Sequence, residues 1–145
     1  GDVGTLTSEN EVVKVLNTVK ENDLIIHITD MIPQEPEADF VATIDVKRRR
    51  KIEANHTTTH LMHAALRQVL GNHVEQKGSL VNDERLRFDF SHFSAMTQEE
   101  LDKVEKLVNE KIAENIAVVT DVCDIEEAKK IVQHCIDNYI ENYCR

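Results

Sequence analysis

The sequence predicts an α+β fold, in which a small N-terminal β-barrel-like subdomain is followed by an α/β sandwich of antiparallel sheet and helices. Short β segments separated by turn residues occupy the first 46 positions, and long amphipathic segments with helical periodicity come only after them. A chain of 145 residues is also long enough to bury a hydrophobic core without disulfide bonds. We therefore expect two domains, at residues 1–46 and 47–145.

The N-terminal β segments are bounded by residues that favour turns. The turns are predicted at Asn22–Asp23 and at Pro33–Pro36, where asparagine, aspartate and proline interrupt the apolar pattern. The predicted strands are Thr5–Thr7, Val12–Val19, Leu24–Ile28 and Phe40–Val46. Because so small a sheet is only marginally stable alone, we expect a small barrel or curled sheet that packs on the residues that follow.

The first long helix is predicted to begin near Ile52 or Asn55 and to end at Gly71, because glycine accepts the backbone conformation that terminates helices. Its apolar side chains recur at helical spacing and form one stripe, which comprises Leu61, Met62, Ala65, Leu66, Val69 and Leu70. The three histidines of this helix project at the edge of the stripe. We therefore expect them to line a cleft beside the core.

Two strands are predicted after the first helix. Val74–Val81 has a β-like pattern, and Arg85–Phe90 alternates strictly between apolar and charged side chains. This alternation is typical of a strand with one buried face. The side chains expected on the buried face are Leu86, Phe88 and Phe90.

Helix-capping patterns predict where the remaining helices begin. Thr97 and Glu100 form a capping box at the start of the second helix. The apolar face of this helix comprises Leu101, Val104, Leu107, Val108 and Ile112. A short strand is expected at Ala117–Val119, and Asp124 is expected to cap a third helix that extends to Ile140.

Two histidines one helical turn apart, His56 and His60, have the spacing of a metal-binding pair. Neutral imidazole suits Zn²⁺, Cu²⁺, Ni²⁺ or Fe²⁺, and the spacing alone does not choose among them. Thr57 stands where the glutamate base of a His-Glu-x-x-His metalloprotease would be, which excludes that protease chemistry. The alternative is that one or more of these histidines are solvated or hydrogen-bonded structural residues.

The formal net charge of -10 argues against a domain that holds nucleic acid by bulk charge, and no DNA partner is expected. The exception is a run of five cations just before the histidines: Lys47, Arg48, Arg49, Arg50 and Lys51. We expect this run to contact phosphates beside the histidine site. The alternative is the solvated face of a linker.

Three further observations concern the setting of the chain. The three cysteines lie in the last quarter without a pairing pattern, which fits a reducing compartment, so we expect a cytoplasmic protein. No apolar run approaches the length that spans a bilayer, and no membrane partner is expected. The first residues show neither an initiator methionine nor a signal pattern, from which we expect a fragment of a longer protein.

Four short motifs follow one another in the chain. They are Gly-Asp-Val-Gly at residues 1–4, Asn-His-Thr-Thr-Thr-His-Leu at 55–61, Gly-Asn-His-Val-Glu-Gln-Lys-Gly-Ser at 71–79 and Leu-Arg-Phe-Asp-Phe-Ser-His at 86–92. Together they resemble the editing region of alanyl-tRNA synthetase, which is shared with alanyl-tRNA editing proteins and, more distantly, with threonyl-tRNA synthetase. The resemblance covers residues 1–118 and is specific, because four motifs agree in order and spacing.

The resemblance implies a module that hydrolyses tRNA for alanine mischarged with serine or glycine at a zinc site. It implies that His56 and His60 are two metal ligands and that Gln76 lines the editing pocket. Thr57 is then a candidate to stabilise the developing oxyanion. The implied partners are the acceptor end of tRNA and the remainder of the synthetase, and ATP belongs only to a catalytic domain outside this chain.

The sequence departs from this family towards its end, where residues 119–145 look divergent or truncated. The family completes its metal site with a downstream Cys-x-x-x-His pair, and this sequence has none. We expect weak metal binding or none unless the fold supplies a third ligand from His63, His92, Cys123, His134 or Cys135. The alternative function is an inactive fragment that serves as a binding site for the tRNA acceptor end or as a structural module.

Overall fold

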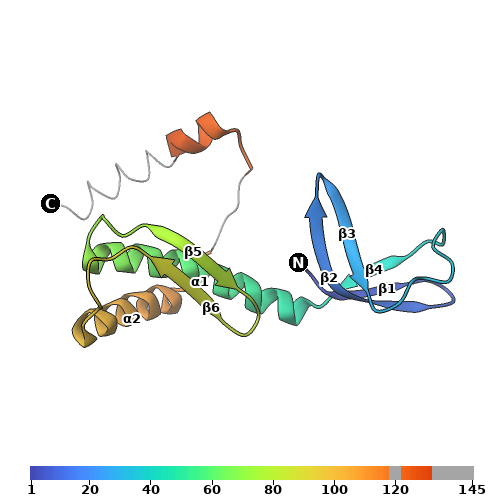
Figure 1. The fold of residues 1–145 in the computed structure, drawn as a ribbon, viewed down its shortest axis with the longest axis horizontal. Helices are drawn as coiled ribbons and strands as arrows, with labels where there is room; N and C mark the ends of the chain where they lie inside the picture. Colours follow the sequence, from blue (N-terminus) through green and yellow to red (C-terminus); the bar gives the residue numbers. More distant parts are fainter. Residues whose placement is uncertain (118–121, 132–145) are drawn as a thin grey trace. The chain divides into compact units, whose positions relative to one another are not determined.

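The computed structural model describes residues 1–117 and 122–131 (Figure 1). The chain divides into two compact units, Gly1–Ala113 and Glu114–Arg145, and the first unit contains two antiparallel sheets and two long helices. The predicted α+β class is therefore confirmed. Within the described residues, no helix combines the length and apolar character needed to cross a membrane.

The first sheet is open, so that, of the small barrel or curled sheet predicted here, the closed barrel does not form. Its strands are β1 (Gly4–Thr7), β2 (Val12–Glu21), β3 (Leu24–Thr29) and β4 (Val41–Ile44). They are joined in the order β3-β2-β1-β4, so that β3 and β4 are opposite edges rather than partners. Closing a sheet requires enough tilted and staggered strands for its edges to meet. Four strands, two of which have only four residues, are too few.

Local geometry explains the hairpin and the tight pairing of this sheet. Asn22 and Asp23 have positive φ angles of 47° and 68°, as in the type I′ turn that matches strand twist, which confirms the turn predicted there. Gly4 lies so close to the carbonyl of Thr43 on β4 that a Cβ atom at this position would clash with the backbone. Val13 and Val15 of β2 are buried, whereas several large apolar side chains of the sheet are exposed.

The helix α1 spans Val46–Leu70 and begins earlier than the predicted start at Ile52 or Asn55. The Oδ1 atom of Asp45 accepts a hydrogen bond of 2.9 Å from the Arg48 N–H and caps the helix. Lysine and arginine are good helix formers, so the cationic run continues the helix and is not a linker. The helix ends at Gly71, as predicted, where φ is 113°.

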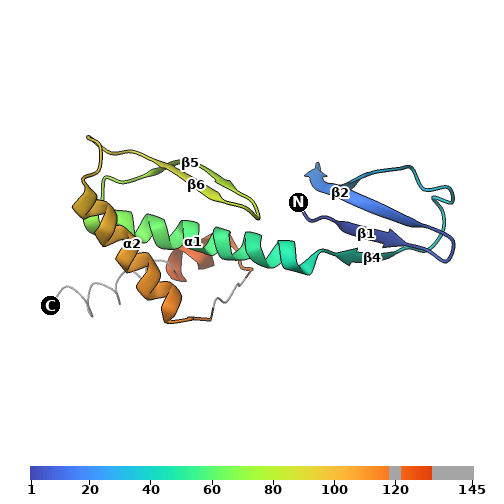
Figure 2. The same ribbon diagram turned by 90° about the horizontal axis from the view of Figure 1, so that it is seen from below.

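The second sheet is a hairpin of β5 (Gln76–Val81) and β6 (Leu86–Phe90), which confirms the two strands predicted here. A β-bulge between Gln76 and Gly78 interrupts the pairing near the start of β5. The hairpin loop is held by Asn82, whose side-chain oxygen accepts hydrogen bonds from the backbone N–H groups of Glu84 and Arg85. The views in Figures 1 and 2 place this hairpin alongside α1.

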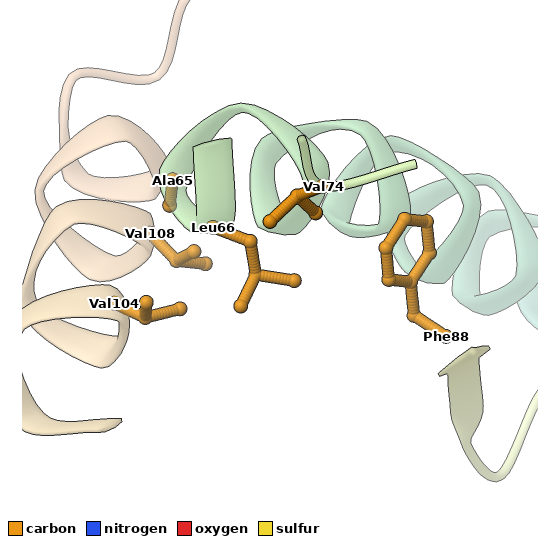
Figure 3. Close-up of a cluster of buried hydrophobic side chains, with 6 residues drawn as sticks. All are labelled: Ala65, Leu66, Val74, Phe88, Val104 and Val108. Carbon is orange, nitrogen blue, oxygen red and sulfur yellow. The ribbon is translucent and has the colours of Figure 1, made fainter. Parts of the chain in front are cut away.

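The main hydrophobic core joins α1, the second sheet and the helix α2 (Gln98–Ala113). Its fully or nearly buried side chains are Ala65, Leu66, Val74, Phe88, Val104 and Val108, shown in Figure 3. The predicted stripe of α1 and the predicted inner face of β6 both pack in or against this cluster. In α2, Val104, Leu107 and Val108 behave as predicted, but Leu101 and Ile112 are exposed.

Both C-terminal helices begin at the capping residues that the sequence predicts, Thr97 and Asp124. The backbone N–H of Thr97 donates to Glu100 Oε2 at 2.8 Å, and the Glu100 N–H donates to Thr97 Oγ1 at 3.3 Å. Asp124 accepts from the N–H groups of Glu126 and Glu127 at the start of a helix described over residues 125–131. Ala117 is not in a strand, and the rest of the strand and helix predicted beyond these points lies outside the described residues.

We expect truncation of the core to cost far more stability than the same truncation at the surface. Leu66→Ala should lower the free energy of unfolding by about 2–5 kcal/mol, because a buried leucine loses its contacts and leaves a cavity. Urea titration followed by circular dichroism measures this change. The matched control is Leu24→Ala, since Leu24 is 64% exposed, and its effect should stay within about 0.5 kcal/mol. Equal losses in both variants would contradict the assigned core.

We also expect the start of α2 to depend on pH. The hydrogen bond from the Thr97 backbone lowers the pKa of Glu100, so the folded state favours the ionised carboxylate. At pH values above the ordinary glutamate pKa, a carboxyl group whose pKa is lowered in the folded state stabilises the fold. This stabilisation disappears as the pH falls through the pKa of the folded state. The stability gap between wild type and Glu100→Ala should therefore narrow in acid. Thr97→Ala should cost about 0.5–2 kcal/mol at neutral pH. Urea titrations at several pH values test both, and a constant gap would refute the linkage.

Candidate functional site

His56 and His60 lie one turn apart on α1, and both side chains are exposed. Their ring centroids are 4.9 Å apart and their planes meet at 83°. Both rings are thus accessible from solvent, and metal binding by the pair stays a prediction. The pair lies at an open surface and not in the partly desolvated cleft expected at the edge of the apolar stripe.

His63 is separated from this pair by its contacts with the second sheet. Its Nε2 atom lies 3.4 Å from the Val74 carbonyl oxygen, and its ring centroid is 5.4 Å from that of Phe88. These contacts hold a half-buried imidazole against the core. His63 therefore has a structural role here and does not join His56 and His60.

The donor set at the pair provides two ligands, and catalytic zinc normally requires three protein ligands. Within residues 1–117 and 122–131, no group of three or more histidine, cysteine, aspartate or glutamate side chains is arranged to hold a metal ion. Among the third ligands considered, His92 is hydrogen-bonded to His73 instead. His134 and Cys135 lie outside the described residues. The described residues thus fit one side of a zinc site only.

The threonines between the two histidines differ in the use of their hydroxyl groups. Thr58 donates to the Ala54 carbonyl at 2.9 Å, and Thr59, which is buried, donates to the Asn55 carbonyl at 3.0 Å. Such bonds to the preceding helical turn satisfy the hydroxyl donor. Within the described part of the chain, the hydroxyl of Thr57 has no such bond. It remains available to an external oxygen.

Gln76 is exposed at the start of β5, where it pairs with Phe90 just before the bulge. The segment that contains β5 is tied to α1 on both sides of the histidine pair. On one side the Val74 carbonyl contacts His63, and on the other the Asn55 side chain donates to the Asn82 carbonyl at 2.8 Å. The hairpin that carries Gln76 is therefore fixed alongside the part of α1 that carries His56 and His60.

The structure divides the five cations at the start of α1 into two groups. Arg48 forms an ion pair of 3.1 Å with Asp83 and donates to the Gly1 carbonyl. Arg49 forms ion pairs with Asp2 at 2.6 Å and Glu53 at 2.9 Å. Hydrogen bonding to Glu53, followed by the charge of Asp2, raises the pKa of Arg49.

These two arginines connect the chain start and the β5–β6 loop to α1. In contrast, Lys47, Arg50 and Lys51 are exposed, and none has an ion pair within the described part of the chain. The sequence predicts that all five cations contact phosphates. In the structure, Lys47, Arg50 and Lys51 are available for such contacts, whereas Arg48 and Arg49 already contact acidic residues.

One cluster was not predicted from the sequence. His73 Nε2 and His92 Nδ1 are 2.9 Å apart, so the two imidazoles share a hydrogen bond. Phe93 stacks on His73 with a centroid distance of 4.4 Å, although its side chain is 87% exposed. His73 and His92 come from different motifs, and no local sequence pattern relates residues so far apart. Only the pairing of the segments before β5 and after β6 brings them together.

Comparison with known proteins gives a consistent result. No protein-family model matches the chain. It is 58% identical over 132 residues to the alanine–tRNA ligase of Cytophaga hutchinsonii and 53% identical over 132 residues to that of Bacteroides fragilis. It is 47% identical over 133 residues to the alanine–tRNA ligase of Fusobacterium nucleatum. Each match covers 90% of this chain but only 15% of the relative.

We expect the chain to bind Zn²⁺ weakly and through the exposed pair. Replacing either His56 or His60 with alanine should abolish this binding, because one imidazole alone holds zinc poorly. Calorimetric titration with zinc chloride measures it. His27→Ala is the matched control, since His27 is an exposed histidine of β3, and it should bind zinc like the wild type. Equal affinity in all three variants would show that the pair is not the binding site.

Proposed function

From the premise that this chain belongs to the alanine–tRNA ligases as a segment of about 15% of their length, we propose that it is an editing module. Its proposed substrate is tRNA for alanine that carries serine or glycine in place of alanine, and its reaction is hydrolysis of the aminoacyl ester. The observation that carries this proposal is the accessible pair of His56 and His60, one turn apart on α1.

The pair fits part of a metal site. His56 and His60 would supply two imidazole ligands to Zn²⁺, and further ligands would come from outside the described residues or from the rest of the synthetase. When bound, zinc supplies a Lewis acid that polarises an ester carbonyl or lowers the pKa of a water molecule. Exposure of both rings supports this assignment, because it leaves an ion bound there accessible to the reactive end of a tRNA.

The chain itself offers two polar groups for the ester. The Thr57 hydroxyl, which has no bond within the described part, would donate to the oxyanion that develops during hydrolysis. The Gln76 side chain, exposed at the start of β5, carries an amide that both donates and accepts hydrogen bonds. It would orient the polar aminoacyl group in the editing pocket.

The relatives' name describes the joining of alanine to tRNA, and we propose that this activity belongs to the whole protein. The sequence contains only four glycines and no phosphate-cradling loop, so we assign no ATP site to this segment. The proposed partners are the tRNA acceptor end and the remainder of the synthetase. The proposed location is the cytoplasm.

A second candidate function is tRNA binding or structural support without hydrolysis. It is favoured by the incomplete ligand set, because the described residues provide only two of the three ligands expected of catalytic zinc. The two functions differ in one measurable property. A binding module holds the tRNA and leaves the ester bond intact.

The decisive experiment measures release of serine from seryl-tRNA for alanine, with zinc supplied to the purified chain. We expect hydrolysis that falls to the uncatalysed rate in His56→Ala and His60→Ala. Thr57→Val, which removes a hydroxyl but keeps the side-chain shape, should lower the rate about 100-fold, the cost of one oxyanion donor.

His27→Ala serves as the control for loss of an exposed histidine and should retain the wild-type rate. Hydrolysis that survives both His56→Ala and His60→Ala would refute the proposed site. No hydrolysis by the wild-type chain, together with retained tRNA binding, would favour the second candidate function.

A further inference from the structure

The first turns of α1 separate the five cations by direction. Successive helical residues are rotated by about 100°, so Lys47, Arg50 and Lys51 share one side of the helix. We call these three residues the cation face. Arg48 and Arg49 point away from it, towards the acidic groups that they contact.

The ion pairs of Arg48 and Arg49 make these two residues poor phosphate ligands. Arg49 is held by two carboxylates, and Arg48 by one carboxylate and one backbone carbonyl. A phosphate would have to displace these partners and would thereby release the chain start from α1. Their charge is used within the molecule.

The cation face has the opposite properties. All three side chains are exposed, and within the described residues none is neutralised by an acidic partner, although the chain has 27 acidic and 17 basic residues. The first turn of α1 contains no acidic residue, and the positive end of a helix dipole disfavours cations. This arrangement opposes folding locally and concentrates positive potential on an otherwise acidic chain.

The cation face is also turned away from the histidine pair around α1. At about 100° per residue, the mean directions of the two sets differ by about 150°, and the nearest members, Arg50 and His60, differ by about 80°. An RNA strand held by Lys47, Arg50 and Lys51 therefore follows a different side of the helix from the one that carries His56 and His60. This geometry opposes the sequence-based expectation that the run meets phosphates beside the site.

We propose that Lys47, Arg50 and Lys51 bind the phosphate backbone of an RNA at a distance from its reacting end, and that Arg48 and Arg49 take no part. The identification of that RNA as tRNA rests on the proposed function. The charge, exposure and direction of the three side chains are observations independent of that function. Phosphate contacts of this kind position a nucleic acid without reading its sequence.

The test is the salt dependence of RNA binding. The probe is a fluorescent RNA hairpin with an unpaired 3′ end and no amino acid, in buffer containing a chelator. Affinity is measured between about 50 mM and 200 mM salt, where each phosphate contact contributes about 0.7–0.9 to the slope of log K against log salt. The variant Lys47→Gln, Arg50→Gln, Lys51→Gln should lose about two to three units of slope.

The matched control removes the same charges elsewhere, through Lys14→Gln, Arg85→Gln and Lys130→Gln, all at exposed positions. It should keep the wild-type slope. A charge-preserving variant, Lys47→Arg, Arg50→Lys, Lys51→Arg, should also keep it, and circular dichroism of each variant shows whether the fold is retained. Equal loss in the control, an unchanged slope in the test variant, or no RNA binding by the wild type would overturn the proposal.

The result is independent of the editing assay. The probe has no ester and the buffer has no free zinc, so an inactive chain can still show the predicted slope. Conversely, a chain that hydrolyses seryl-tRNA and shows no change of slope would retain the proposed function and lose the cation face as its RNA contact.

Discussion

The helical period of α1 is the constraint on which the rest of the first unit depends. One side of this helix carries the stripe that packs against the second sheet and α2. Another side carries the two accessible histidines, and the first turns direct three cations away from them. Because all three sets are fixed to one rigid backbone, their relative directions are determined by residue number alone. The hairpin and α2 are needed to bury the stripe, and the histidines remain outside the core for the same reason.

Electrostatics at the start of α1 explain why such a helix forms at all. Five consecutive cations near the positive end of the helix dipole repel one another and the dipole. Asp45 compensates by capping the helix, and Asp2, Glu53 and Asp83 neutralise two of the arginines. The same contacts attach the first residues and the β5–β6 loop to the helix. With two arginines neutralised in this way, the helix tolerates the other three cations, which have no acidic partner among the described residues.

Features that depend on near neighbours could be predicted from the sequence. The capping box of Thr97 and Glu100, the stripe of α1 and the alternation in β6 are of this kind, and all three are present. The start of α1 was missed because its apolar pattern begins only after the charged turns. The ion pair of Arg49 with Asp2 and the contact of His73 with His92 depend on chain segments distant in sequence. The candidate metal ligands could be predicted from their motif. Their exposure at an open surface could not, because it depends on how segments outside the motif pack.

The direct junction between β4 and α1 has a consequence for how this segment can change. Ile44 ends the strand, Asp45 caps the helix and Val46 begins it, so no slack separates the first sheet from the helix. A single inserted or deleted residue at this point would turn all of α1 by about 100° relative to the first sheet. Asp2 would then face a side chain other than that of Arg49. Substitutions at exposed positions of α1, in contrast, would leave the directions of its other side chains unchanged. The length of the junction, more than its chemistry, is the quantity that evolution or an engineer must preserve here.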